Sequence, residues 1–125
     1  MVWSMTSAAT DWSAIAERVA GVRRVAGDFA AAAKMHFRGR LKDIRLFGSA
    51  ARGDWREGSD VDVLLLLDDV TPQDRDWIAE EATRKGILGR GVLISTVTLS
   101  VSRYEFLRRR ERLFVREIDE QGMPL

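Results

Sequence analysis

The sequence predicts an α/β (α+β) protein in which a small mixed β-sheet of about three strands packs against helices. Two observations support this fold class. Segments with apolar residues at helical spacing alternate along the chain with short apolar runs that favour strands. Hydrophobic residues make up 46% and charged residues 31% of the 125 residues, which is typical of a globular protein rather than a disordered one.

The first expected element is a helix over residues 11–37. Asp11 is suited to cap its start, and Gly39 predicts its end. Between them, apolar side chains recur at intervals of three and four residues, which places them on one face. This stripe consists of Ile15, Val19, Val22, Ala26, Phe29 and Ala33.

Three short segments have the composition of strands. Residues 43–47 form a short strand, and residues 61–67 are nearly all apolar, as expected of a central strand covered on both faces. Residues 91–99 are rich in Val, Ile and Thr and form the third strand. Between the first two strands, residues 49–52 suit one helical turn and residues 53–59 a polar loop.

The helix expected over residues 71–86 is marked at both ends. Thr71 and Asp74 make a capping-box pattern at its start, and Gly86 is interpreted as its end.

Two further helices are expected over residues 100–121, the first capped by Ser100 or Ser102 and the second ending near Gly122. We therefore interpret residues 1–125 as a single domain. It consists of the N-terminal helix 11–37, a central region 42–99 that carries the candidate catalytic residues, and the C-terminal helices 100–121.

Composition excludes several kinds of site. The chain has no cysteine and a single histidine, His36, so a metal ion would have to be held by oxygen, which favours magnesium, manganese or calcium. The net charge of +1 argues neither for nor against a nucleic-acid partner. The first ten residues lack the pattern of a signal peptide, and no apolar run is long enough to span a bilayer. We expect a soluble, cytoplasmic protein without a membrane partner.

Two carboxylates stand at the start of the strand 61–67. Asp60 and Asp62 are two residues apart, so on a strand they point to the same side, roughly 7 Å from each other. Like charges at this spacing repel unless a cation lies between them. A second pair at this spacing, Asp74 and Asp76, falls within the helix 71–86 and is assigned to a solvated face.

The residues that precede this pair raise its significance. Gly48 lets the backbone turn tightly and approach a ligand closely, and Ser49 offers a hydroxyl and a backbone N–H. Arg52 adds a positive charge nearby. A phosphate-binding turn and a metal-binding strand thus lie one short loop apart, which is the combination that phosphoryl or nucleotidyl transfer requires.

This pattern resembles the polymerase-beta-like nucleotidyltransferase superfamily. It consists of Gly48-Ser49, ten intervening residues and Asp60-Val61-Asp62, flanked by the apolar residues Phe47 and Val63. The segment Ser59-Asp60-Val61-Asp62 is typical of the minimal nucleotidyltransferase (MNT) branch. The resemblance is specific over residues 46–67 and looser over residues 91–125.

The resemblance implies a polymerase-beta-palm-like fold and a set of site residues. Asp60 and Asp62 would be catalytic and would coordinate Mg²⁺ or Mn²⁺. The nucleotide, for which ATP is expected, would be held by Gly48, Ser49, Arg52 and Ser59. For Arg52 an ordinary ion pair is the alternative interpretation.

The implied activity is transfer of a nucleoside monophosphate, AMP from ATP, to a hydroxyl of a protein or small-molecule acceptor. We expect no separate acceptor domain, so the acceptor site would come from a second copy in a homo-oligomer or from another protein. Stand-alone members of the family are often paired with HEPN-family proteins in toxin–antitoxin systems. The alternative function is therefore an antitoxin with weak or no catalysis that neutralises a HEPN-family toxin by binding.

One departure from the family pattern separates these two functions. Active members usually carry a third carboxylate on a neighbouring strand, but residues 91–99 contain no Asp or Glu. The corresponding position falls near Leu93 or Ser95, and neither can act as a strong general base at neutral pH. The sequence therefore favours nucleotide binding more strongly than turnover.

Two other features have an ordinary interpretation beside a functional one. The basic run 108–110 is interleaved with acidic residues, which favours a solvated face, so nucleic acid is not an expected partner. Trp55 lies in the loop before Asp60, where it either anchors the loop in the core or borders the nucleotide.

Overall fold

The computed structural model describes residues 11–110 and 112–125. The N-terminal segment that lacks the pattern of a signal peptide lies outside the described residues. The helices are α2 (Trp12–Phe37), the 3₁₀ turn η1 (Arg38–Arg40), α3 (Ser49–Arg52), α4 (Pro72–Thr83), the π-helical turn η2 (Arg84–Leu88), α5 (Val101–Arg109) and α6 (Leu113–Gln121). The strands are β1 (Leu41–Phe47), β2 (Val61–Leu67), β3 (Ile94–Ser100) and β4 (Met123–Pro124).

The strands form one mixed sheet in the order β3-β2-β1-β4. Strand β1 is antiparallel to both β2 and β4, whereas β2 and β3 are parallel. The expected mixed sheet is confirmed, but it has four strands rather than three. The sequence did not reveal β4 because two residues are too few for a periodic pattern, and β4 is defined by its pairing with Arg45 and Leu46.

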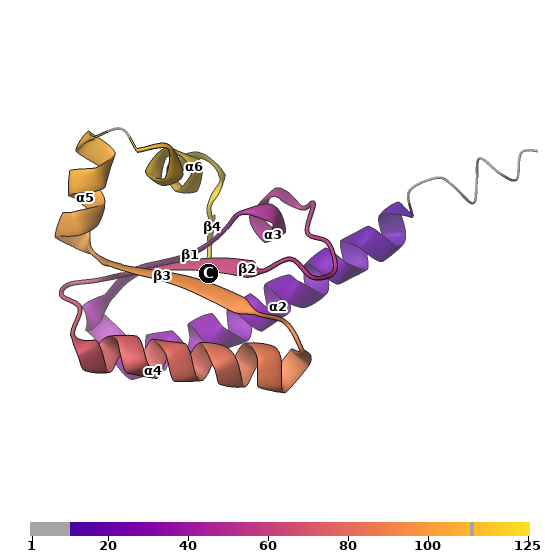
Figure 1. The fold of residues 1–125 in the computed structure, drawn as a ribbon, viewed down its shortest axis with the longest axis horizontal. Coiled ribbons are helices and arrows are strands. Elements are labelled where there is room, and N and C mark those ends of the chain that lie inside the picture. The colour runs from indigo at the N-terminus through magenta and orange to yellow at the C-terminus, as the bar shows by residue number, and fades with distance from the viewer. Residues whose placement is uncertain (1–10, 111) are drawn as a thin grey trace, which may run out of the picture.

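The sheet separates two hydrophobic cores, with α2 and α4 on one face and α5 and α6 on the other (Figure 1). The odd-numbered residues of β2, from Val61 to Leu67, belong to the larger core under α2 and α4. Leu64 and Leu66 point the other way and belong, with Tyr104 and Ile118, to the second core under α5 and α6. Strand β2 is therefore covered on both faces, as its apolar run predicts.

Three expected helix caps are present. The Asp11 side chain accepts a hydrogen bond from the backbone N–H of Ala14, and Thr71 and Asp74 form a complete capping box. Of the two candidates for α5, it is Ser100 whose side chain accepts from the backbone, at Arg103. Local sequence therefore fixes where these helices begin.

Several element ends differ from the expected ones. Strand β1 begins at Leu41, two residues earlier than expected, and β3 spans Ile94–Ser100 rather than residues 91–99. Helix α2 ends at Phe37 as expected, but the residue with positive φ that follows is Arg38 (φ 52°), not Gly39.

Contrary to the sequence prediction, Gly86 does not end the helix but has another structural role. The helical path continues past Thr83 as the π-helical turn η2, which contains Gly86. A Cβ atom at Gly86 would lie 2.5 Å from the carbonyl oxygen of Val92. Gly86 is therefore needed because the segment before β3 passes close to this turn, a contact that local sequence does not disclose.

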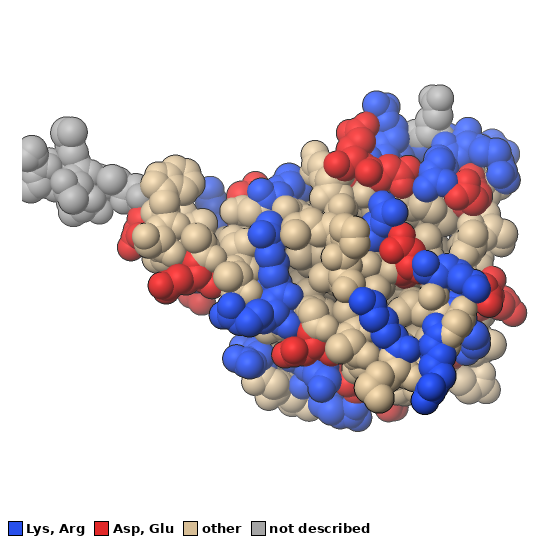
Figure 2. Space-filling model, turned by 180° about the vertical axis from the view of Figure 1, so that it is seen from behind, with Lys and Arg blue, Asp and Glu red and all other residues tan. Residues whose placement is uncertain are grey.

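Charged residues are distributed over the surface with both signs. Lys and Arg side chains are scattered over the rear face among acidic and uncharged ones (Figure 2). Within α5, Arg108 pairs with Glu105 and with Asp119 of α6, as expected for a solvated face. None of the helices in the described part of the chain combines the length and the hydropathy that crossing a bilayer requires.

Candidate active site

The site begins where β1 ends against the start of β2. Phe47, the last residue of β1, pairs with Asp62, so Gly48 follows directly beside that aspartate. A Cβ atom at Gly48 would lie only 2.3 Å from Asp62 Oδ2, and Gly48 has φ 71° and ψ −154°. Only glycine adopts this backbone conformation readily, and only glycine leaves room for the carboxylate. The turn and the aspartate strand, separated in sequence by a loop, are thus in direct contact.

The two aspartates flank the fully buried Val61. Asp60 is exposed, whereas Asp62 is partly buried on the sheet face that α5 and α6 cover. Burial raises the pKa of Asp62, and the negative charges of Asp60 and Glu117 raise it further, while Arg52 opposes this effect. A cation between the carboxylates would remove the repulsion.

The donor set fits a divalent metal that takes the rest of its ligands from substrate and water. Two carboxylates, Asp60 and Asp62, are available in this place. Over residues 11–110 and 112–125, no group of three or more His, Cys, Asp or Glu side chains is arranged to hold a metal ion.

The expected helical turn after Gly48 is present as α3. The carbonyl of Gly48 accepts hydrogen bonds from the backbone N–H groups of Ala51 and Arg52, at 3.1 and 3.0 Å. Ser49 is the first residue of the turn, and Gly53 ends it with φ 91°. Gly48 and Ser49 therefore lie next to Asp62 in a defined conformation.

Arg52 forms an ion pair in this structure. Its Nη1 lies 2.9 Å from Glu117 Oε1 on α6, and its Nε lies 3.6 Å from Asp54 Oδ2. The ion-pair role weighed for Arg52 is therefore present, and its contact with phosphate stays a prediction. No sequence pattern marks Glu117 as a site residue, because only the packing of α6 onto this face brings it near Asp62.

Trp55 anchors the loop between the turn and β2. The indole is buried, with 6% of its surface exposed, and its Nε1–H donates to the carbonyl of Ser59 at 3.1 Å. Trp55, Ser59 and Asp60 also line a cavity of about 620 Å³, together with Arg90 and Leu93. This cavity gives a small molecule or a side chain access to Asp60, while the role of Ser59 toward a nucleotide stays a prediction.

The register of β3 shows which residue occupies the position where the family resemblance leads us to expect a third carboxylate. Ser95 is in register with Asp62, and the next pair on that face, Val97 and Leu64, belongs to the core under α5 and α6. Ser95 therefore shares a face with Asp62. Leu93 precedes the strand and is 49% exposed. Of the two positions considered, Ser95 is the one beside the aspartates.

The chain matches a family of known proteins over most of its length. Residues 31–122 match the model of the nucleotidyltransferase domain. A protein of Methanocaldococcus jannaschii, named as a "putative protein adenylyltransferase", is 37% identical over 98 residues, which are 78% of this chain and 91% of that protein. A crystal structure of a protein from Sulfolobus solfataricus, described as a "putative nucleotidyltransferase", aligns with a TM-score of 0.43 at 13% identity, covering 93% of this chain and 86% of that one.

The matched region contains every residue of the site described above, from the Gly48–Ser49 turn to Glu117. The pattern of residues and the matched domain agree on the same activity, transfer of a nucleotidyl group. This chain belongs to the nucleotidyltransferase family.

Proposed function

We propose that this protein transfers AMP from ATP to a hydroxyl group of a protein acceptor, with a divalent metal held by Asp60 and Asp62. The nucleotidyltransferase domain supports the reaction type. The choice of AMP and of a protein acceptor is supported by the relative from Methanocaldococcus jannaschii, whose name describes a protein adenylyltransferase.

The contact between Gly48 and Asp62 carries this proposal. At that contact, the turn that can bind phosphate lies directly against Asp62, one of the two carboxylates that can bind metal. A nucleoside triphosphate with its metal ion needs both elements within a few ångströms, because the metal binds phosphate oxygens and carboxylates together.

Each residue has a defined task in this proposal. Asp60 and Asp62 hold the divalent ion, which supplies charge neutralisation for the phosphates when it is bound. Gly48 and Ser49 hold the terminal phosphates through backbone N–H groups and the serine hydroxyl. Arg52 contacts phosphate after it exchanges its ion pair with Glu117 for the nucleotide.

The reaction is a displacement at the α-phosphorus of ATP. The acceptor hydroxyl oxygen forms a bond to that phosphorus, and the bond to the oxygen that bridges to the β-phosphorus breaks. Pyrophosphate leaves with that bridging oxygen, and the hydroxyl proton passes to solvent. Magnesium is preferred to calcium on chemical grounds, since Mg²⁺ is the usual partner of substrate phosphates.

A binding assay followed by a transfer assay tests the proposal. Wild-type protein is expected to bind Mg-ATP in calorimetry, and the double variant Asp60→Ala/Asp62→Ala is expected to lose this binding. With ATP labelled at the α-phosphate, label should appear on a partner protein only with wild-type enzyme and metal. Absence of Mg-ATP binding by the wild-type protein would count against the enzymatic proposal.

A second function is favoured by Ser95. Because this serine occupies the position opposite Asp62, no carboxylate on β3 assists the acceptor hydroxyl. We therefore also propose an antitoxin that neutralises a HEPN-family protein by binding alone.

One pair of substitutions separates the two functions. If neutralisation requires transfer, Asp60→Ala/Asp62→Ala abolishes it together with labelling. If binding suffices, the same double variant neutralises the partner as well as wild type does, and neither wild type nor the double variant transfers label.

A further inference from the structure

We propose that Arg23 on α2 is a positioning residue that holds the Gly48–Ser49 turn in the conformation required to bind phosphate. This inference rests on the proposed function. It concerns a residue that no motif marks, since Arg23 lies 25 residues before Gly48 in the sequence.

The guanidinium of Arg23 binds two successive carbonyls of α3. Its Nε donates to the carbonyl of Ala50 at 2.9 Å, and its Nη2 donates to the carbonyl of Ala51 at 3.0 Å. The two donors are fixed in one plane, so this contact sets the direction of both peptide groups rather than only their distance.

A turn as short as α3 depends on such external contacts. Its four residues, Ser49–Arg52, make too few hydrogen bonds to offset the entropy of ordering them. The carbonyls of Gly48 and Ser49 accept from backbone N–H groups within the segment, and Arg23 supplies the donors for the next two carbonyls. The four successive carbonyls from Gly48 to Ala51 are thereby satisfied.

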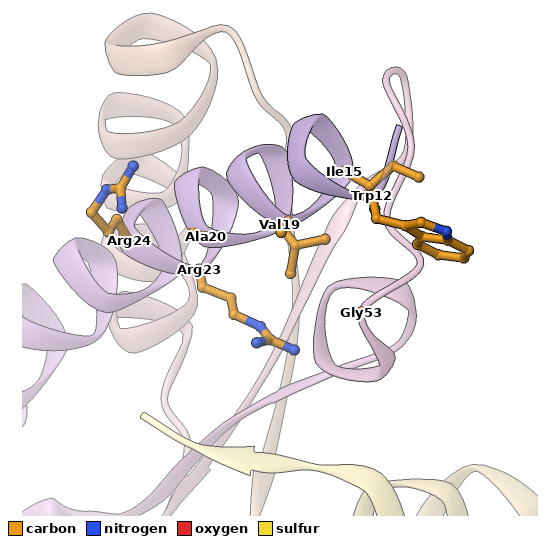
Figure 3. A pocket seen from close by; sticks show the side chains of 8 residues that line it. Trp12, Ile15, Val19, Ala20, Arg23, Arg24 and Gly53 are labelled. Atoms are coloured by element: carbon orange, nitrogen blue, oxygen red, sulfur yellow. The ribbon is translucent and has the colours of Figure 1, made fainter. Parts of the chain in front are cut away.

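The shape of the neighbouring chain fits this contact. Arg23 extends from α2 toward the turn that carries Gly53, whereas the Arg24 side chain is directed away from that turn, although both residues line the same cavity (Figure 3). A Cβ atom at Gly53 would lie 4.0 Å from Arg23 Nη2, and the φ of 91° at Gly53 lets the chain leave the turn beside the guanidinium. Arg23 also lines a cavity of about 600 Å³ between α2 and this turn.

The consequence concerns the position of Ser49 relative to Asp62. Helix α2 packs firmly in the larger core through residues such as Val22 and Phe29. Through Arg23, this rigid helix fixes the far side of α3, and thus the direction in which the serine hydroxyl and the backbone N–H groups point. Loss of the two hydrogen bonds should loosen the turn without removing any group that touches the nucleotide.

The test compares Arg23→Met, Arg23→Lys and the matched control Arg24→Met in the full chain. Amide hydrogen exchange of residues 49–53 reports the order of the turn, and calorimetry reports the affinity for Mg-ATP. Ile78→Val, a change in the core under α4, shows what a general loss of stability does to both readouts.

We expect Arg23→Met to exchange these amides about tenfold faster and to bind Mg-ATP about tenfold more weakly, with Arg23→Lys in between. Arg24→Met and Ile78→Val should keep the wild-type affinity. Unchanged exchange in Arg23→Met, or an equal loss of affinity in Arg24→Met, overturns the inference. If wild type binds no Mg-ATP but the exchange difference is seen, the proposed function fails while the role of Arg23 in ordering the turn stands.

Discussion

At the scale of single residues, the contact between Gly48 and Asp62 is the most restrictive feature of the site. Gly48 combines a positive φ with a carboxylate oxygen where its Cβ would be. Gly58 also has a positive φ, 86°, but nothing lies within 4 Å of a Cβ built there. Substitution of Gly58 therefore reports the free-energy cost of backbone strain alone, whereas substitution of Gly48 reports strain together with a steric conflict.

We predict that Gly48→Ala lowers the free energy of unfolding by about 2–3 kcal/mol and abolishes measurable Mg-ATP binding. The added methyl group must displace the Asp62 carboxylate. The control Gly58→Ala should cost about 1 kcal/mol and leave binding intact. Urea denaturation and calorimetry measure both quantities, and equal effects of the two substitutions would contradict the steric explanation.

Asp62 itself is held in an unfavourable environment. Its raised pKa, caused first by burial and then by Asp60 and Glu117, means that the folded protein disfavours the charged form. We predict that Asp62→Asn raises the melting temperature of the metal-free protein by up to about 5 °C, because a neutral amide removes the repulsion. The same variant should lose the stabilisation that wild type gains from Mg²⁺ with ATP. A lower melting temperature for metal-free Asp62→Asn would show that the charge is not destabilising.

At the scale of elements, the starts of helices were more predictable than their ends. Asp11, Thr71 and Ser100 cap helices where the sequence places them, because a side chain that accepts from a backbone N–H acts within three residues. The ends depend on packing. Gly86 shows this, since it admits the carbonyl of Val92 rather than ending a helix.

The start of α4 is also tied to the chain before β1. The solvated face expected for Asp74 and Asp76 is correct only for Asp76, because Asp74 is 6% exposed and pairs with Arg40. Arg40 donates to both oxygens of Asp74, at 3.0 and 2.5 Å, and the backbone N–H of Thr71 donates to the same carboxylate. The guanidinium of Arg40 is the main cause that lowers the pKa of Asp74 to about 2. The stability that this group contributes is therefore present above its ordinary pKa of about 4 and is lost as the pH falls toward 2.

We predict that Asp74→Asn lowers the melting temperature by roughly 5 °C at pH 7, and that the difference from wild type narrows as the pH falls from about 4 to 2. Asp76→Asn, an exposed change on the same helix, is the control and should have little effect. Thermal unfolding followed by circular dichroism at a series of pH values measures the difference. A difference independent of pH would rule out the ion pair as its source.

At the scale of the whole molecule, the order of the strands determines which side chains meet the aspartates. Strand β3 lies beside β2, so Ser95 faces the same side as Asp62, and α6 brings Glu117 to the same region. The resemblance of the pattern to known nucleotidyltransferases pointed to Leu93 or Ser95. The parallel register of β3 selects Ser95.

We predict that Ser95→Asp introduces a third carboxylate at the site. Neighbouring strands lie about 4.8 Å apart, so the new charge would repel Asp62 and lower the melting temperature of the metal-free protein by several degrees, about 3–8 °C. Mg²⁺ should restore more stability to this variant than to wild type, and label transfer from ATP should increase. Ser95→Asn is the uncharged control. A variant that gains nothing from Mg²⁺ would contradict the placement of Ser95 beside the metal-binding carboxylates.

The sequence by itself determined the class of fold and the two halves of the site. Local patterns predict the mixture of strands and helices and the buried strand Val61–Leu67, because backbone conformation and side-chain alternation act over a few residues. They also mark the Gly48–Ser49 turn and the pair Asp60 and Asp62. Their assignment to a nucleotidyltransferase was confirmed by the matched domain.

Only the tertiary structure decided which residues surround these halves. Arg23, Glu117 and Ser95 come from α2, α6 and β3, and the two-residue strand β4 exists only by pairing with β1. No local pattern marks Arg23, Glu117 or β4, and the pattern pointed only to Leu93 or Ser95 on β3, because each of these features is defined by a contact with a segment at least 25 residues away in the chain. The physical reason is that strand order and helix packing minimise the free energy of the whole core, while motifs report only the conformation of their own segment.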